Sequence, residues 1–282
     1  MNVAASKVER VVRGVATSDG AGVALTRLIG GSDLPDLDPF LLLDQFGTDK
    51  AEDYIAGFPS HPHRGFETVT YMLDGRMRHR DNRGHEGLLT PGSVQWMTAG
   101  RGIIHSEMPE QEAGLMRGFQ LWVNLAAKDK MIEPRYQEFQ ASMIPVLESQ
   151  AGTRVKVIAG SVGAITGPIA DVGTQPLYLD VTLAAGAQFE HPLPLTHQAF
   201  VVVYEGRARI GVNEDSRALD SLSLGVLTRG KVVQARADSI ATRMLLIAAK
   251  PLGEPVARYG PFVMNTRAQL QEAFEDFSAG RL

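Results

Sequence analysis

Residues 66–76, which read FETVTYMLDGR, contain the pattern that decides the fold class. Residues 66–73 form an alternating, apolar run typical of a β-strand, and Asp74-Gly75 is a strong signal for the turn of a hairpin. Residues 201–207, VVVYEGR, repeat the same order of strand, acidic residue, glycine and arginine. A repeat of this kind predicts two copies of one structural unit.

Short apolar or alternating runs, broken by glycine, continue along the chain. They lie at residues 76–80, 88–89, 93–97, 118–125, 155–158, 177–183, 200–204, 207–212 and 244–249. Strands this short and closely spaced predict an all-β protein built as sandwiches or barrels. One short helix is expected at the C-terminal end, where Thr266 can cap it, Gln269 completes a capping box, and Gly280 lies just past its end.

The chain length favours two domains. At roughly 100–200 residues per domain, 282 residues accommodate two barrels, each able to bury its own core. A polar, charged stretch with Pro134 and Pro145 marks the junction. We therefore predict an N-terminal barrel at residues 1–130, a linker at 131–145, and a C-terminal barrel with the terminal helix at 146–282.

Composition excludes several classes of protein and site. The net charge of −4, with scattered basic residues, argues against direct nucleic-acid binding, which depends on clustered Lys and Arg. The absence of cysteine excludes disulfides and thiolate metal sites, so any metal must bind nitrogen and oxygen. No apolar run is long enough for a signal peptide or a membrane span. A cytoplasmic protein is expected, also nuclear in a eukaryote.

Two residue pairs carry the chemistry: His61-Pro62-His63 and His105-Ser106-Glu107. Residues i and i+2 of a strand point to the same face, so each pair can present two ligand atoms to one point. If the two strands are neighbours, spaced by roughly 5 Å, the four side chains converge. Three imidazoles and a carboxylate suit a divalent transition metal such as iron, nickel, copper or zinc.

Two long stretches around these pairs resemble the signature of the pirin family. They are residues 58–71, FPSHPHRGFETVTY, and residues 91–109, PGSVQWMTAGRGIIHSEMP, with shorter matches at 42–46 and 260–266. Pirins are bicupins of the cupin superfamily. The resemblance implies two cupin barrels packed face to face and one metal in the N-terminal barrel, held by His61, His63, His105 and Glu107. The internal pairing of two barrels favours a monomer, and the sequence leaves the oligomeric state open. It implies Fe(II) first, with Ni, Cu, Mn or Zn as alternatives.

Other charged side chains leave alternatives open. Glu67 has the strand parity of His61 and His63 and matches the carboxylate ligand of ordinary cupins. The resemblance to pirins favours Glu107 as the ligand and leaves Glu67 to orient a histidine. Arg101 is expected either to meet an anionic substrate at the cavity rim or to pair with a structural carboxylate.

The remaining histidines do not repeat the pattern. His79 and His85 are expected to be exposed on a charged hairpin. His191 and His197, in the second half, lack the His-x-His spacing, so the C-terminal barrel is expected to bind no metal.

The resemblance implies two classes of function. Some pirin-like proteins resemble quercetin 2,3-dioxygenases, which open a flavonol ring; Glu107 would then accept the proton of the substrate hydroxyl. Other pirins are metal- and redox-dependent regulators that bind a transcription factor or a metabolic enzyme without turnover. Because both classes share the fold and the ligands, the fold cannot decide between them. A deep cavity above the metal favours the enzyme, and a shallow, plugged one favours the regulator.

Overall fold

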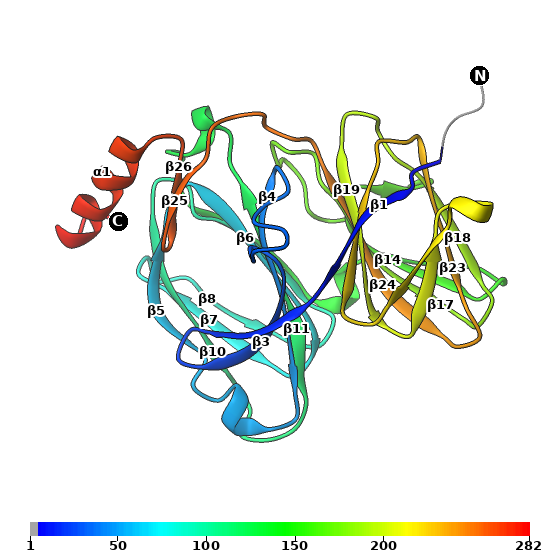
Figure 1. Cartoon of the computed structure of the whole chain (residues 1–282). Helices are drawn as coiled ribbons and strands as arrows, with labels where there is room; N and C mark the ends of the chain where they lie inside the picture. Colours follow the sequence, from blue (N-terminus) through cyan, green and yellow to red (C-terminus); the bar gives the residue numbers. More distant parts are fainter. Residues whose placement is uncertain (1–4) are drawn as a thin grey trace. The chain divides into compact units, whose positions relative to one another are not determined.

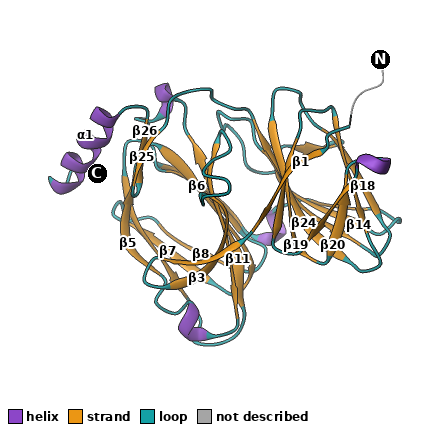
Figure 2. Cartoon of the chain, viewed as in Figure 1, coloured by secondary structure: helices purple, strands orange, loops and turns teal. Residues whose placement is uncertain are grey.

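The computed structural model describes residues 5–282 and consists of β-strands with one α-helix in that range (Figure 1, Figure 2). The chain forms two compact units. The first unit comprises Ala16–Ala141 and Leu252–Leu282, and the second comprises the described residues up to Val15 and Ser142–Pro251. The predicted boundaries, 1–130, 131–145 and 146–282, differ from this division because each end of the chain joins the other half's unit.

The first unit contains a seven-stranded, a four-stranded and a two-stranded sheet. Its strands are β2 (Val15–Asp19), β3 (Val23–Ile29), β4 (Phe40–Thr48), β5 (Phe58–His63), β6 (Phe66–Asp74), β7 (Met77–Asp81), β8 (Glu86–Leu89), β9 (Val94–Thr98), β10 (Ile103–Pro109), β11 (Met116–Asn124), β12 (Arg135–Phe139), β25 (Ala257–Tyr259) and β26 (Phe262–Met264). The strand orders are β12-β9-β6-β11-β4-β3-β2, β5-β10-β7-β8 and β25-β26.

The second unit repeats this plan. Its strands are β1 (Val8–Arg13), β13 (Val146–Glu148), β14 (Thr153–Ala159), β15 (Ser161–Val162), β16 (Ile165–Thr166), β17 (Leu177–Leu183), β18 (Gln188–Pro192), β19 (Gln198–Glu205), β20 (Arg207–Ile210), β21 (Arg217–Asp220), β22 (Ser223–Leu227), β23 (Val232–Ala237) and β24 (Thr242–Ala249). They are ordered β1-β22-β19-β24-β17-β14-β13, β18-β23-β20-β21 and β15-β16. Short 3-10 turns occur at Ala51–Asp53, Ala127–Asp129, Ala141–Met143 and Asn213–Asp215.

The predicted internal repeat is confirmed by the strand orders. Strands β4 to β11 correspond in sequence to β17 to β24, and the matching strands occupy matching places in their sheets. The two glycine turns in the repeated sequence pattern also occupy equivalent positions. Gly75 (φ 82°) follows β6, and Gly206 (φ 76°) follows β19. Both positions need the left-handed backbone that glycine adopts without strain.

The ends of the chain complete the two sheets. β1 pairs with β22 in the second unit, just as β12 pairs with β9 in the first. β12 lies within the predicted linker, so this polar stretch forms the edge of a sheet. Edge strands expose one face and one hydrogen-bonding edge to water, which explains why β12 reads as a linker in the sequence.

The C-terminal segment carries the one α-helix of the described residues, α1 (Arg267–Ser278). The predicted capping box is confirmed: Thr266 and Gln269 satisfy each other's backbone N–H groups. Leu270 and Ala273 are buried against Phe262 and Met264 of β26. In the described part of the chain, no helix has the length and apolar character needed to span a membrane.

Candidate metal centre

Three of the predicted ligands converge in the four-stranded sheet of the first unit. β5 and β10 are antiparallel neighbours, and His105 pairs directly with His61. One ring nitrogen each from His61, His63 and His105 lies within 4.8 Å of the others. The expected adjacency of the two strands is confirmed, and this cluster can hold a metal ion.

In each of the three rings the Nδ1 atom contacts a partner within the protein, so the Nε2 atom remains available to bind an ion. His61 Nδ1 lies 2.8 Å from the Pro59 carbonyl oxygen, and His63 Nδ1 lies 3.4 Å from that of Pro261. His105 Nδ1 lies 3.3 Å from His79 Nδ1. When each Nδ1 is used by an outer partner, Nε2 is left as the ligand atom, an arrangement common in metal sites.

Those Nε2 atoms are crowded and poorly partnered by protein. The Nε2 atoms of His61 and His63 lie 3.0 Å apart. His105 Nε2 is buried and has no hydrogen-bond partner in the described structure. A buried polar nitrogen without a partner is costly, and a shared cation would relieve all three at once.

Burial keeps these imidazoles in the form that binds metals. The pKa of His63 and that of His105 are well below the ordinary value, because burial penalises the charged ring and neighbouring histidines repel a second proton. Neutral imidazole is the ligand form.

Glu107 faces the same interior as the histidines, but its carboxylate does not belong to the cluster of three. A β-bulge follows His105, so Glu107 pairs with Phe58 of β5. Glu107 Oε1 lies 2.9 Å from the Thr70 hydroxyl, which also lies 2.7 Å from Gln120 Oε1. Burial raises the pKa of Glu107, and the charge of His61 opposes that shift.

Glu67 lies on the other face of β6. Phe66 contacts His63 with ring centroids 5.0 Å apart, so the adjacent Glu67 must point away from the histidines. Its Oε1 accepts a 2.7 Å hydrogen bond from Thr98. The parity argument that placed Glu67 near the ion is therefore wrong, because the turn at Arg64-Gly65 separates β5 from β6 and interrupts the alternation.

His79 was expected to be exposed, and it is 1% exposed. Its Nε2 lies 2.8 Å from the Tyr136 hydroxyl, and its pKa falls to about 4, mainly through burial. His85 is partly exposed, with its ring stacked on Tyr136 at 4.1 Å. The alternation in Met77-Arg78-His79-Arg80 indicates that His79 is buried, because residues i and i+2 of a strand share a face and Met77 is apolar.

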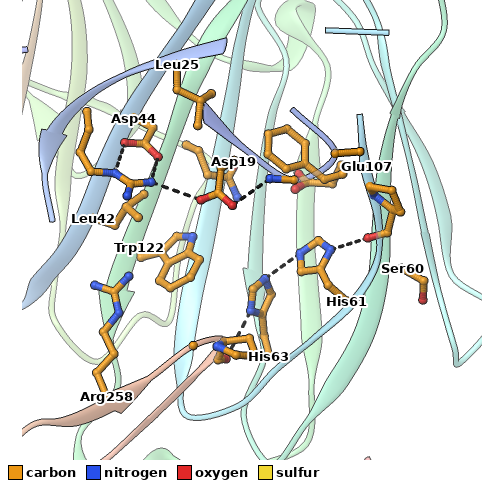
Figure 3. Close-up of a pocket in the computed structure, with 18 residues that line it drawn as sticks. Asp19, Leu25, Leu42, Asp44, Ser60, His61, His63, Glu107, Trp122 and Arg258 are labelled. Carbon is orange, nitrogen blue, oxygen red and sulfur yellow. Dashed lines mark hydrogen bonds and ion pairs between the residues drawn. The ribbon is translucent and has the colours of Figure 1, made fainter. Parts of the chain in front are cut away.

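His61 and His63 line a cavity of about 580 Å³ (Figure 3). Its wall combines the metal-site side chains with apolar and charged groups: Leu25, Arg27, Leu42, Asp44, Phe58, His61, His63, Glu107, Gln120, Trp122 and Arg258. Arg27 binds the buried Asp44 through two hydrogen bonds, of 2.9 and 2.7 Å. Arg101 is not among the residues that line the cavity. It forms an ion pair of 2.7 Å with Glu133, which agrees with the expectation that it pairs with a carboxylate of the protein.

The turn after His63 is fixed by residues that sequence reasoning missed. A Cβ on Gly65 (φ 87°) would lie 2.0 Å from the Val263 carbonyl oxygen, so only glycine fits. Lys130 is 1% exposed, and its ammonium donates to Gly65 O, Asn124 Oδ1 and Val263 O. Arg64 forms a buried ion pair of 2.9 Å with Asp276 of α1.

The second unit has a different interior. β23 contributes Val233, Ala235 and Ala237 to an apolar core at the place where β10 contributes His105 and Glu107. His191 is buried beside Phe189, and His197 Nε2 lies 2.9 Å from the Gln175 carbonyl oxygen.

Comparisons with known proteins cover nearly the whole chain. The pirin family model matches residues 22–123, and that of the pirin C-terminal cupin domain matches 178–282. A pirin-like protein of Caulobacter vibrioides is 54% identical over 97% of this chain and 98% of its own length. A Pseudomonas aeruginosa protein named as a candidate quercetin 2,3-dioxygenase is 50% identical over 94% of each. The crystal structure of a quercetin 2,3-dioxygenase from Acinetobacter baumannii superposes with a TM-score of 0.89 at 34% identity, covering 99% of this chain and 98% of that one.

Proposed function

The chain belongs to the pirin family of bicupins, and on that premise we propose that it is a metal-dependent dioxygenase of the quercetin 2,3-dioxygenase type. In this proposal His61, His63, His105 and Glu107 hold one divalent transition metal in the first unit. The observation that carries it is the convergence of one ring nitrogen each from His61, His63 and His105, with His105 Nε2 buried without a partner, beside a cavity that His61 and His63 line.

Fe(II) is the metal we propose for the cell, with Ni, Cu, Mn or Zn as alternatives that supply and affinity order could favour. A bound redox-active metal supplies Lewis acidity and electron transfer to the bound substrate. Three neutral imidazoles and one carboxylate are a suitable donor set for such ions. An ion held by these four side chains would have further positions for substrate, and His61, His63 and Glu107 line the cavity.

The protein's own groups would bind and orient the substrate. The cavity of about 580 Å³ falls within the range typical of small-molecule sites, and a cavity of this size beside the histidines favours an enzyme over a regulator. The apolar side chains of Leu25, Leu42 and Phe58 would hold a flat aromatic compound such as a flavonol and exclude water. Glu107, which also lines the cavity, would accept the proton of the substrate hydroxyl.

Oxygen consumption with quercetin tests this proposal. The protein is loaded anaerobically with Fe(II), and uptake is compared with that of His61→Ala and of a matched control, His191→Ala in the second unit. We expect uptake that requires both the metal and His61 and that His191→Ala leaves unchanged. Stoichiometric binding of iron, nickel, copper and manganese without any uptake would sink the oxygenase proposal. Metal-dependent binding to a regulatory protein partner would then be the leading account.

A further inference from the structure

We propose that Arg258 forms an anion-binding subsite at the mouth of the metal cavity, which selects aromatic substrates that carry a carboxylate. The inference rests on the proposed function, because it names a substrate class for the same cavity. Quercetin has hydroxyl groups and no carboxylate, so the subsite predicts that a hydroxylated aromatic acid binds better than a neutral analogue.

The charges of the cavity wall single out Arg258. Two arginines line the cavity, and Arg27 is neutralised by Asp44 and, at 3.2 Å, by Asp19. Among the described residues, Arg258 has no ion pair; its Nη1 donates one hydrogen bond of 2.9 Å, to the Leu41 carbonyl oxygen. A guanidinium carries five N–H donors, so the exposed Arg258 has donors left over for a ligand from solvent.

Trp122 holds the guanidinium in place and connects it to the metal centre. The Cζ atom of Arg258 lies 4.8 Å from the centroid of the Trp122 ring. The same ring lies 5.2 Å from that of His63, in a T-shaped contact. Figure 3 shows Trp122 with His63 on one side and Arg258 on the other. Stacking on an aromatic face orients the planar donor fork, and a carboxylate can accept two parallel hydrogen bonds from it.

The backbone also fixes Arg258 relative to the histidines. Arg258 pairs with Val263 in the β25–β26 hairpin, and the Val263 N–H donates to Arg64 O at 3.0 Å, directly after His63. The Pro261 carbonyl of the hairpin turn contacts His63 itself. The donor fork and the metal ligands are therefore held by one connected set of strands.

An added anion would complement the guanidinium of Arg258. Desolvation, and then the positive charge of Arg27, lowers the pKa of Arg258, while the carboxylates of Asp44, Asp19 and Asp36 act in the opposite direction. A carboxylate beside the guanidinium would oppose the two lowering effects by stabilising the charged form. A substrate that reaches from the metal past Trp122 would place its aromatic ring against Leu42 and its acidic group at Arg258.

Equilibrium binding to protein loaded with zinc(II) tests the subsite without any turnover, because zinc has no redox chemistry. The probes are 3,4-dihydroxycinnamate and its amide, which share the metal-chelating catechol and differ in the charge of the tail. Calorimetry compares wild type with Arg258→Gln, whose amide can still donate to Leu41 and lie on Trp122. Arg258→Lys is a second variant, and Arg101→Met is the matched control, an exposed arginine outside the cavity.

We expect wild type and Arg101→Met to bind the acid about tenfold more tightly than the amide, as one charge-assisted hydrogen-bonded pair would give. Arg258→Gln should bind both probes equally with unchanged zinc content, and Arg258→Lys should keep part of the preference. Equal binding of acid and amide by wild type, or a preference that survives in Arg258→Gln, would overturn the subsite and leave the proposed oxygenase intact. Failure of both probes to bind would overturn the subsite as well. Absence of oxygen uptake with quercetin would leave the measured preference unaffected.

Discussion

The Nδ1 atoms of His105 and His79 lie 3.3 Å apart in the interior of the first unit, and His79 Nε2 reaches the Tyr136 hydroxyl at 2.8 Å. Only one of two facing ring nitrogens can carry the proton. If His105 Nδ1 donates to His79, then His79 carries its own proton on Nε2 and donates it to Tyr136. That tautomer leaves His105 Nε2, the buried atom without a partner, with a lone pair that could bind a metal ion.

We therefore predict that His79→Leu weakens metal binding by about 10- to 100-fold, the usual effect of removing the outer partner of a ligand histidine. Competition with a chelator of known affinity measures it. Tyr136→Phe, which removes only the outer hydroxyl, should have a smaller effect in the same direction. Unchanged affinity in a folded His79→Leu protein would show that the contact does not orient His105.

Substitution of the two candidate carboxylates, Glu107 and Glu67, should affect metal affinity differently. Glu107→Gln should lower metal affinity by about tenfold or more, because a ligand contributes at least as much as an outer partner. Glu67→Gln should leave affinity unchanged, because Glu67 points away from the histidines on β6. The same chelator competition, run on both variants side by side, decides between them. Loss of affinity in Glu67→Gln alone would instead support the ligand set of ordinary cupins.

Sequence periodicity located the fold and the histidines well, because both depend on local alternation. The spacing of His61 and His63 and the turns at Gly75 and Gly206 are features of single strands and hairpins. The error at Glu67 arose where alternation was carried across a turn. The alternation of side chains between the two faces holds only within one strand. The left-handed Gly65 forms the turn between β5 and β6, so the alternation of β5 does not continue into β6.

Other parts of the site depend on contacts between distant segments. Lys130, Asp276 and Arg258 lie far from His61 and His63 in sequence. Lys130 reaches the turn at Gly65 directly, and Asp276 and Arg258 belong to the C-terminal segment, which joins the first unit. An isolated lysine or arginine in a polar stretch carries no local pattern that distinguishes a buried contact from a solvated one. Only the fold reveals their roles.

Lys130 allows a stability prediction. Its buried ammonium serves three acceptors, which join the turn at Gly65 to Asn124 and Val263. Lys130→Met would leave those oxygens without their donor, and we expect a loss of unfolding free energy on the order of 3 kcal/mol. Urea denaturation measures it, with the exposed Lys128→Met as the control, expected within about 0.5 kcal/mol of wild type. Equal midpoints for the two variants would contradict a structural role for Lys130.

Glu67 allows a prediction about pH. Burial raises its pKa to about 7, with the hydrogen bond from Thr98 acting in the opposite direction. Between about pH 4.5 and pH 7, Glu67 is therefore protonated in the folded protein and ionised in the unfolded chain. Its contribution to the free energy of unfolding falls as pH rises through that range. The side chain introduced by Glu67→Gln stays neutral. Between pH 5 and pH 8, the unfolding free energy of this variant should therefore rise relative to that of wild type by up to about 3 kcal/mol. Denaturation of both proteins in the presence of a chelator measures the difference, since the histidines titrate alike in each. Parallel stability curves across that range would show that Glu67 is ionised in the folded protein at both pH values.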